Sequence, residues 1–308
     1  MHDETHDTSS LPYFSPEHEL LRAQIRRFVE TEIKPYAQAW EDQGFVPREV
    51  LRRMGELGFF GIRYPQQYGG SEMDVLASVV LAEELGRSTF GGVAITVLVH
   101  TDMASVHIYN SDNQAIRDQF MPDIISGKKI VAVAVTEPDA GSDVKNIRTR
   151  ARRDGNDYLL SGTKMFVTNG IYADLYCVAA KTTQDARPSE SISMFLVERD
   201  RPGFRVGKKL EKHGWLSSDT AELIFEDCRI PQSNLLGAEG RGFYAIMRNF
   251  QNERVVMGAM AMGEAQAAID LTLAWVTQRQ AFGSSLWLKQ AIRHRLAMLA
   301  AKVEAGRQ

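Results

Sequence analysis

The sequence predicts an α+β fold with an N-terminal helical domain, a middle antiparallel β domain and a C-terminal helical bundle. Three observations predict it. Apolar residues recur at helical spacing over most of residues 1–128. Short alternating or wholly apolar runs between turn residues follow, up to about residue 235. A helical pattern then resumes near Gly242 and continues to Gln308. Helices, then strands, then helices is an α+β order, and we divide the chain into domains at 1–128, 129–235 and 236–308.

Five helices are expected in the N-terminal domain, each from an apolar stripe and its flanking Pro, Gly or capping residue. They run from Glu17 to about Glu41, from Pro47 to Gly58, from Asp74 to Leu85, from Val93 to Tyr109 and from Asn113 to Ser126. The Gly- and Pro-punctuated segment Gly61–Gly70 should be a loop. The segment Val93–Tyr109 carries no charge except Asp102, so it should be a buried helix.

Seven short runs in the middle domain have the character of strands. They are Ile130–Val135, Arg148–Arg152, Tyr158–Ser161, Met165–Thr168, Leu175–Ala180, Ile192–Val197 and Ala221–Phe225. Asp154-Gly155-Asn156 is a hairpin signal, and Thr182–Ser189 should be a polar loop. The chain contains no GxGxxG or Walker fingerprint, so a nucleotide would not be held by a Rossmann turn or a P-loop.

Composition excludes several classes of protein. The formal net charge is -3 and there is no basic patch, which argues against nucleic acid as a partner. No apolar run is expected to be long enough to span a membrane. The N-terminus, MHDETHDTSS, is neither a signal peptide nor an Arg-rich transit peptide, and we expect a cytoplasmic protein.

No metal site is predicted. Cys177 and Cys228 lack metal-ligand spacing and are expected to be reduced, structural thiols. His100 and His107 lie seven residues apart on a predicted helix, which is too far for one metal ion. Core or interface positions are the better interpretation of both histidines.

Two segments of the β domain carry groups that could hold a ligand. In VAVAVTEPDAGSDV (131–144), a buried run ends in small residues and in the hydroxyls of Thr136 and Ser142, which can approach a flat or anionic ligand closely. The carboxylates of this loop, Glu137 among them, could pin it in place. In GTKMFVTNG (162–170), Phe166 and Thr168 would point the same way in a strand. From residue types alone, an ordinary turn and a plain strand exit explain these segments at least as well.

A carboxylate lies on the apolar face of the first C-terminal helix. Ile246, Phe250, Glu253 and Met257 are spaced by three and four residues, which puts Glu253 on the apolar stripe. A carboxylate there is costly unless it is paired or needed. A pair with Arg254 would explain it without any function. Glu264 lies near the same stripe and shares this ambiguity.

The literal sequence strings narrow these alternatives. TEPDAGSD, GTKMFVTNG, SSDTAELIFEDCRIP, NERVVMG and RQAFG resemble, in this order, motifs of the acyl-CoA dehydrogenase family of flavoproteins, and the resemblance covers nearly all of residues 14–308. The string NERVVMG (252–258) resembles the long-chain and isovaleryl branch, which places its catalytic base on this helix.

The resemblance implies the residues of the site. Glu253 is the catalytic base, and Glu264 is structural. The positions that match FAD contacts are Val133, Val135, Thr136, Gly141, Ser142, Phe166, Val167, Thr168, Arg279, Phe282 and Gln290. The positions that match substrate contacts are Ser142, Tyr244, Gln251, Asn252 and Arg254. In the family the arginine matching Arg279 reaches the flavin of a neighbouring subunit, so a homodimer or homotetramer is expected.

The resemblance also implies the reaction. Glu253 would remove a proton from the α carbon of an acyl-CoA thioester, and a hydride would leave the β carbon for the flavin. The thioester oxygen would be held by the base's own backbone N–H and a flavin hydroxyl. Electrons would pass to an electron-transferring flavoprotein. We therefore expect an FAD-dependent acyl-CoA dehydrogenase of fatty-acid or branched-acyl catabolism.

Two alternatives stay open. Full-length members of the family continue through further helices, so the chain is expected to be C-terminally incomplete and to leave Leu271, Trp275, Leu296 and Leu299 poorly covered. Such a chain could be a flavin-poor, catalytically weak binding or assembly module. An acyl-CoA oxidase or a flavin monooxygenase on the same scaffold is the other alternative, although a carboxylate at Glu253 argues against the monooxygenase.

Overall fold

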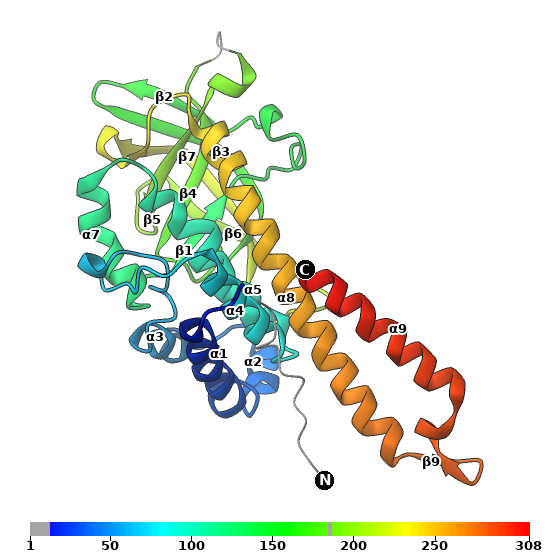
Figure 1. Cartoon of the computed structure of the whole chain (residues 1–308). Coiled ribbons are helices and arrows are strands. Elements are labelled where there is room, and N and C mark those ends of the chain that lie inside the picture. The colour runs from blue at the N-terminus through cyan, green and yellow to red at the C-terminus, as the bar shows by residue number, and fades with distance from the viewer. Residues whose placement is uncertain (1–12, 184–186) are drawn as a thin grey trace.

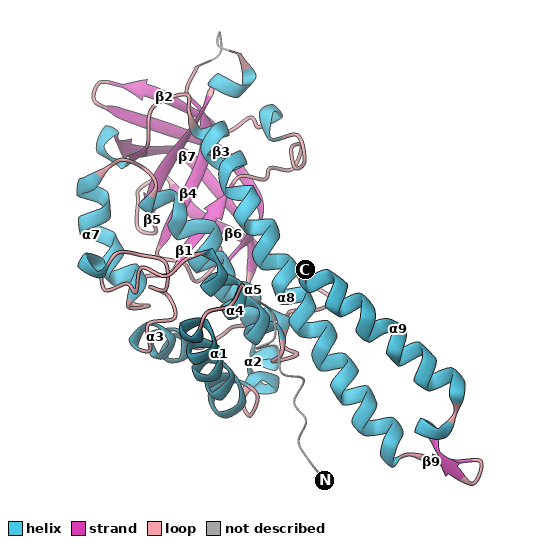
Figure 2. Ribbon diagram, in the orientation of Figure 1, coloured by secondary structure: helices cyan, strands magenta, loops and turns pink. Residues whose placement is uncertain are grey.

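The computed structural model describes residues 13–183 and 187–308, and shows helices at both ends of the chain and a sheet between them (Figures 1 and 2). The α+β order predicted from the sequence is confirmed. Part of the predicted polar loop Thr182–Ser189 lies outside the described residues.

The N-terminal part is built from helices and two π-helical segments. These are α1 (Pro16–Phe28), the π segment Val29–Ile33, α2 (Ala37–Gln43), α3 (Arg48–Glu56), α4 (Val75–Gly86), α5 (Gly91–Leu98), the π segment Val99–Ala104, α6 (Ser105–Tyr109) and α7 (Gln114–Ile125). A single 3-10 turn, Gln66–Tyr68, lies in the predicted loop after α3. Ser15, Asp74 and Asn113 cap α1, α4 and α7 with side-chain oxygens, which explains why these helices begin where they do.

One predicted helix is wrong. The apolar pattern predicts one continuous helix from Glu17 to about Glu41, but the helical segment ends at Ile33 and α2 begins only at Ala37. Pro35 lies in the gap, where its missing N–H and its ring are incompatible with a continuous helix. Within α1, Leu20 is 67% exposed although it is apolar.

The middle part is one eight-stranded sheet. Its strands are β1 (Val131–Ala134), β2 (Arg150–Asp154), β3 (Asp157–Thr168), β4 (Leu175–Lys181), β5 (Ile192–Glu198), β6 (Phe204–Lys209), β7 (Thr220–Pro231) and β8 (Leu235–Leu236). The order is β6-β7-β3-β2-β4-β5-β8, with β1 parallel to β4. The remaining pairs are antiparallel except for a single parallel pairing of β2 with β4.

The strands differ from the prediction in three places. The two runs Tyr158–Ser161 and Met165–Thr168 belong to one strand, β3, which continues through register shifts near Gly162 and between Lys164 and Val167. Strand β6 was missed because it lies mostly exposed and is rich in Arg and Lys, so no apolar run marks it. Strand β8 was also not predicted, because its two residues are too few to form a recognisable pattern. The predicted hairpin is confirmed between β2 and β3, with Gly155 at a φ of 63°.

The strands β1, β4 and β5 are buried on both faces, which explains their continuous apolar runs. Along β4, Leu175 and Cys177 pack on the face that the helices cover, whereas Tyr176 and Val178 pack into a second core cluster on the opposite face. The helix-side cluster also contains Ile246 from the long helix α8 (Gly242–Gln278). The sheet, α7 and that helix are therefore held by one core.

The C-terminal part is a long helical hairpin. Helix α8 (Gly242–Gln278) runs from the sheet past the N-terminal helices, a small hairpin of β9 (Gln280–Ala281) and β10 (Ser284–Ser285) turns the chain, and α9 (Gln290–Arg307) returns (Figure 1). Helix α8 packs closely on α4, because a Cβ added at Gly86 or Gly263 would lie 2.2 or 2.0 Å from a facing carbonyl oxygen. Leu271 and Trp275 are exposed as expected. Leu296 has little exposed surface, but together with Leu299 it lines an apolar groove of about 720 Å³ between α8 and α9.

One helical stretch of the described chain, Gly91–Tyr109, is long and apolar enough to pass a composition test for a membrane span, contrary to the expectation from the sequence. It is 94% buried within the protein. The stretch is therefore the central core helix of the N-terminal part, as its lack of charge predicted.

His100 and His107 are buried in this stretch, and burial lowers the pKa of each to about 4, so both are neutral core histidines. The described residues contain no cluster suited to a metal ion.

Candidate active site

Glu253 lies on the face of α8 that packs toward the N-terminal helices, and its side chain is partly buried. Burial raises the pKa of Glu253 to about 7. The Asn249 amide and the Arg254 guanidinium oppose this rise in part, and the Asp102 carboxylate adds to it. A carboxyl group whose pKa lies near neutral pH is well matched to general-base chemistry.

Asn249 holds the carboxylate of Glu253 in place. Its side-chain Nδ2 donates to Glu253 Oε1 at 2.7 Å, and it also lies 3.1 Å from the carbonyl oxygen of Met103 and 3.3 Å from that of Asp102. Both carbonyls belong to the π-helical segment Val99–Ala104, and such segments are frequent at functional sites. Asn249 is buried, so these contacts fix its rotamer and, through it, the position of the acid.

A buried ion pair joins the two loops that the sequence singled out. Lys164 Nζ lies 2.7 Å from Glu137 Oε1 and also donates to the carbonyl of Val135 at 3.0 Å. Glu137 further accepts the backbone N–H groups of Arg148 and Thr149. Burial alone would raise the pKa of Glu137, but Lys164 and these donors hold it below its ordinary value. The carboxylate therefore pins the loop after β1, as the sequence suggested.

Phe166 projects from a bulge in β3. Its φ of 58° is left-handed, and its side chain is 65% exposed, next to buried Val167. The bulge disrupts the simple alternation that was expected to align Phe166 with Thr168. The N–H of Met165 donates to the carbonyl of Thr136 at 2.8 Å, so the bulge lies directly beside the loop after β1. An exposed aromatic ring in strained backbone is a feature that functional sites concentrate.

The end of β1 lies beside the apolar face of α8. Val133 and Val135 are partly buried, and both pack against the same cluster as Met247 and Phe250 of α8. The predicted flavin loops and the helix that carries Glu253 therefore border one region of the molecule.

The donors around this region fit a flat heterocycle. Within residues 13–183 and 187–308, the hydroxyls of Thr136, Ser142 and Thr168 have no protein hydrogen-bond partner, so they are available to a ligand. Gly141 has open space where a Cβ would be. Together with the exposed ring of Phe166, these groups offer a stacking surface and several hydroxyl donors, which is what an isoalloxazine ring requires.

The predicted substrate contacts divide into two groups. Gln251, Arg254 and Tyr244 are exposed, and Tyr244 lies under the guanidinium of Arg241 at 4.4 Å from the ring centroid. Asn252 instead points into the protein, where it bonds to residues of the N-terminal part. Ser142 is exposed on the loop after β1.

The remaining predicted flavin contacts are far from Glu253 in the same chain. Arg279, Phe282 and Gln290 lie at the tip of the α8–α9 hairpin, the far end from the sheet (Figure 1). Helix rise over the residues that separate Arg279 from Glu253 amounts to about 39 Å. All three side chains are exposed, and Phe282 is 94% exposed. A single copy of the chain cannot bring them to the loops after β1 and within β3.

One implied role does not fit. The resemblance assigned the thioester oxygen to the backbone N–H of the base, but Glu253 lies inside α8, far from either end of that helix. N–H groups inside an α-helix are already bonded to the carbonyl four residues earlier. This donor is therefore not available at Glu253.

Sequence reasoning missed the polar residues beneath Glu253. Asp102 was noticed only as the single charge in an apolar run, which was itself the signal that could have identified it. Arg63 and Asn249 carried no such signal, because an Arg in a loop and an Asn on a helix are ordinary. Lys164 was overlooked because its partner, Glu137, lies in the loop after β1, 27 residues earlier in the chain.

Comparisons with known proteins identify related chains. Three families match, described as the N-terminal domain (residues 15–128), the middle domain (132–228) and the C-terminal domain (240–308) of acyl-CoA dehydrogenase. The mitochondrial long-chain specific acyl-CoA dehydrogenase of Rattus norvegicus is 41% identical over 287 residues, which is 93% of this chain and 66% of that protein. The mitochondrial isovaleryl-CoA dehydrogenase of Pongo abelii is 37% identical, over 96% of this chain and 70% of that protein. The chain thus spans about two thirds of the length of these relatives.

Two solved structures extend the comparison to the fold. An acyl-CoA dehydrogenase from Geobacillus kaustophilus aligns with a TM-score of 0.92 and 41% identity, covering 96% of this chain and 78% of that chain. A glutaryl-CoA dehydrogenase from Mycobacterium smegmatis in complex with FADH2 aligns with a TM-score of 0.89 and 30% identity, covering 97% of this chain and 75% of that chain.

Proposed function

The chain belongs to the acyl-CoA dehydrogenase family, and we propose that it performs the FAD-dependent α,β-dehydrogenation of an acyl-CoA thioester with Glu253 as the base. The observation that carries this proposal is a partly buried carboxylate with a pKa near 7 on α8, beside the loops bearing Phe166 and Thr136. The solved relative with FADH2 supports the choice of cofactor.

The protein's own groups prepare the proton transfer. Asn249 fixes one carboxylate oxygen of Glu253, so the other oxygen is free to face the α carbon. Burial keeps water from competing for the proton and makes the carboxylate a stronger base than an exposed glutamate. The bound flavin would accept the hydride that leaves the β carbon.

The β-domain loops would hold the flavin. Val133, Val135 and Gly141 would border the ring, and Phe166 would stack on it. The hydroxyls of Thr136, Ser142 and Thr168 would donate to its polar edge. Val167 would meet the ring only through its backbone, because its side chain is buried in the core. The buried ion pair of Glu137 and Lys164 keeps the two loops together. The loop containing Ser142 would also meet the thioester, together with Tyr244, Gln251 and Arg254.

We also propose that two copies of the chain complete each flavin site. Arg279, Phe282 and Gln290 lie too far along α8 to reach the loops of their own chain, so they would contact the flavin of a second copy. Arginine suits a pyrophosphate, because it is always charged and presents a fork of donors. Electrons would leave the reduced flavin for an electron-transferring flavoprotein, the acceptor that the family resemblance implies.

The test is flavin reduction by acyl-CoA under anaerobic conditions, followed by the loss of the flavin's visible absorbance. Glu253→Gln in the flavin-loaded protein should slow reduction by at least about 100-fold, since a positioned base contributes factors of this size. Glu264→Gln is the matched control, because Glu264 lies on the same helix and burial also raises its pKa. Reduction at an unchanged rate in Glu253→Gln would remove Glu253 from the role.

A further inference from the structure

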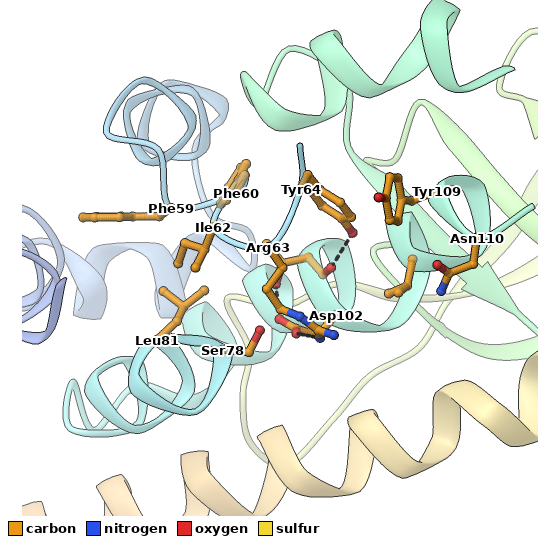
Figure 3. A pocket seen from close by; sticks show the side chains of 12 residues that line it. Phe59, Phe60, Ile62, Arg63, Tyr64, Ser78, Leu81, Asp102, Tyr109 and Asn110 are labelled. Atoms are coloured by element: carbon orange, nitrogen blue, oxygen red, sulfur yellow. Dashed lines mark hydrogen bonds and ion pairs between the residues drawn. The ribbon is translucent and has the colours of Figure 1, made fainter. Parts of the chain in front are cut away.

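A small cavity lies close to the base but on the side of the N-terminal helices. Its volume is about 80 Å³, and it lies between the loop after α3, α4, the π-helical segment Val99–Ala104 and α6. Phe59, Phe60, Ile62 and Leu81 form its apolar wall. Figure 3 shows the guanidinium of Arg63 lying beside Asp102 on the other side of the lining.

The polar side of the cavity is a cluster of three residues. Arg63 Nη1 donates to Asn252 Oδ1 at 2.8 Å and lies 3.6 Å from Asp102 Oδ1. Asn252 Nδ2 lies 3.3 Å from the Asp102 carbonyl. Asp102 is 2% exposed, whereas one third of the Arg63 side chain is exposed. The contacts of the guanidinium within the described chain all use Nη1, so Nε and Nη2 are free to donate into the cavity.

The cluster is connected to the base through two short links. Asn252, which contacts the Asp102 carbonyl, is the residue directly before Glu253 on α8. The Asn249 side-chain amide donates both to the Asp102 carbonyl and to the Glu253 carboxylate. The Asp102 carboxylate also contributes to the raised pKa of Glu253, so this wall of the cavity lies near the base. An acyl chain bound with its α carbon at Glu253 would approach the cavity with the carbons beyond the β position.

The cavity is poorly suited to a long saturated chain. A volume of about 80 Å³ is small beside the roughly 300–1,000 Å³ of pockets that hold whole ligands, so the cavity can take only a part of an acyl chain. A methylene chain laid against this cluster would remove the one-third-exposed Arg63 side chain from water, and it would return no hydrogen bond to Arg63 or to the already buried Asp102. Burying charged groups in this way costs several kcal/mol per ion.

Resting on the function proposed above, we infer that this cavity selects an acyl-CoA that bears a hydroxyl group a few carbons beyond the β position. A hydroxyl can donate to Asp102 and accept from Arg63 at the same time, so it satisfies both sides of the cluster. A terminal carboxylate fits less well, because it would meet the buried negative charge of Asp102. The neighbouring Ser78 and Thr101 hydroxyls extend the polar side of the cavity.

The experiment compares four thioesters of equal length in the flavin-loaded protein: hexanoyl-CoA, two hydroxyhexanoyl-CoAs with the hydroxyl on the δ or the ε carbon, and adipoyl-CoA. We expect kcat/KM to be at least about tenfold higher for a hydroxylated substrate than for hexanoyl-CoA, since one hydrogen bond to charged groups has about this effect. Equilibrium binding to Glu253→Gln, which does not turn over, gives an independent readout and should show the same order.

Arg63→Met should remove most of this preference. Arg87→Met is the matched control, because Arg87 also pairs with an aspartate, Asp270, but lies outside the cavity. Equal kcat/KM and equal affinity for hexanoyl-CoA and both hydroxylated substrates would overturn the inference, as would a preference for adipoyl-CoA or a preference that survives Arg63→Met. If only the inference about the hydroxyl group is wrong, hexanoyl-CoA should still reduce the flavin. If no thioester bound or reduced the flavin, the proposed function would fall as well.

Discussion

Replacing Glu253 with glutamine should stabilise the protein while removing its activity. The folded-state pKa of Glu253 is about 7, against an ordinary value of 4.5. Since the folded state keeps a proton that the unfolded state releases over this range, the free energy of unfolding falls as the pH rises from 4.5 to about 7. At about 1.4 kcal/mol per pH unit, the loss amounts to about 3 kcal/mol.

Glu253→Gln carries no titrating group, so it avoids this loss. At pH 8 it should be up to about 3 kcal/mol more stable than the wild type, and at pH 4.5, where the wild-type acid is protonated, the two should be equal. The carbonyl of a glutamine can still accept from Asn249. Urea unfolding at both pH values measures the difference, and anaerobic flavin reduction measures the loss of activity in the same preparation.

The pH dependence separates this explanation from a general effect of removing charge. Glu49→Gln, which replaces an exposed glutamate on α3, serves as the control and should change stability by less than about 0.5 kcal/mol at either pH. A Glu253→Gln protein that is no more stable at pH 8, or that gains equally at pH 4.5, would show that burial does not raise this pKa.

Three further outcomes follow from the packing and the site. Gly263→Ala should lower the stability measured in thermal unfolding by about 1–3 kcal/mol or more, since its Cβ would lie 2.0 Å from a carbonyl oxygen of α4. Gly258→Ala on the same helix is the control: its Cβ would have no atom within 4 Å, so it should raise the stability by about 0.5–1 kcal/mol. Equal effects of the two substitutions would contradict the close approach of α8 and α4. Lys164→Met leaves its buried carboxylate partner without a cation, so denaturant unfolding should show a loss of about 3–5 kcal/mol, and a loss below about 1 kcal/mol would mean that the pair is not buried in solution. Wild-type kcat/KM should fall about tenfold per pH unit below a midpoint at about pH 7, where Glu253 becomes protonated. Asn249→Ala should move this midpoint to higher pH, because it removes a hydrogen bond that favours the charged form of Glu253. An unchanged midpoint would show that Asn249 does not act on the base.

Much of the fold followed from local patterns. The apolar run at Val131 predicted a buried strand, and Asp154-Gly155-Asn156 predicted the hairpin between β2 and β3, because both signals are contained in a few consecutive residues. The errors also have local causes. Pro35 was passed over inside a strong helical stripe, and β6 was hidden by its charged, exposed residues.

The sequence by itself determined the order of helices and strands, the family, and the position of Glu253 on an apolar stripe, since each depends on residues that are close together in the chain. Only the tertiary structure decided what surrounds that acid. Asp102 and Asn252 are 150 residues apart, and Glu137 and Lys164 are 27 apart, so their contacts exist only because α8 packs on the N-terminal helices and β1 lies beside β3. Burial and pairing of charges depend on such long-range neighbours, and these, more than the residue types, set the pKa of the acid and the polarity of the cavity next to it.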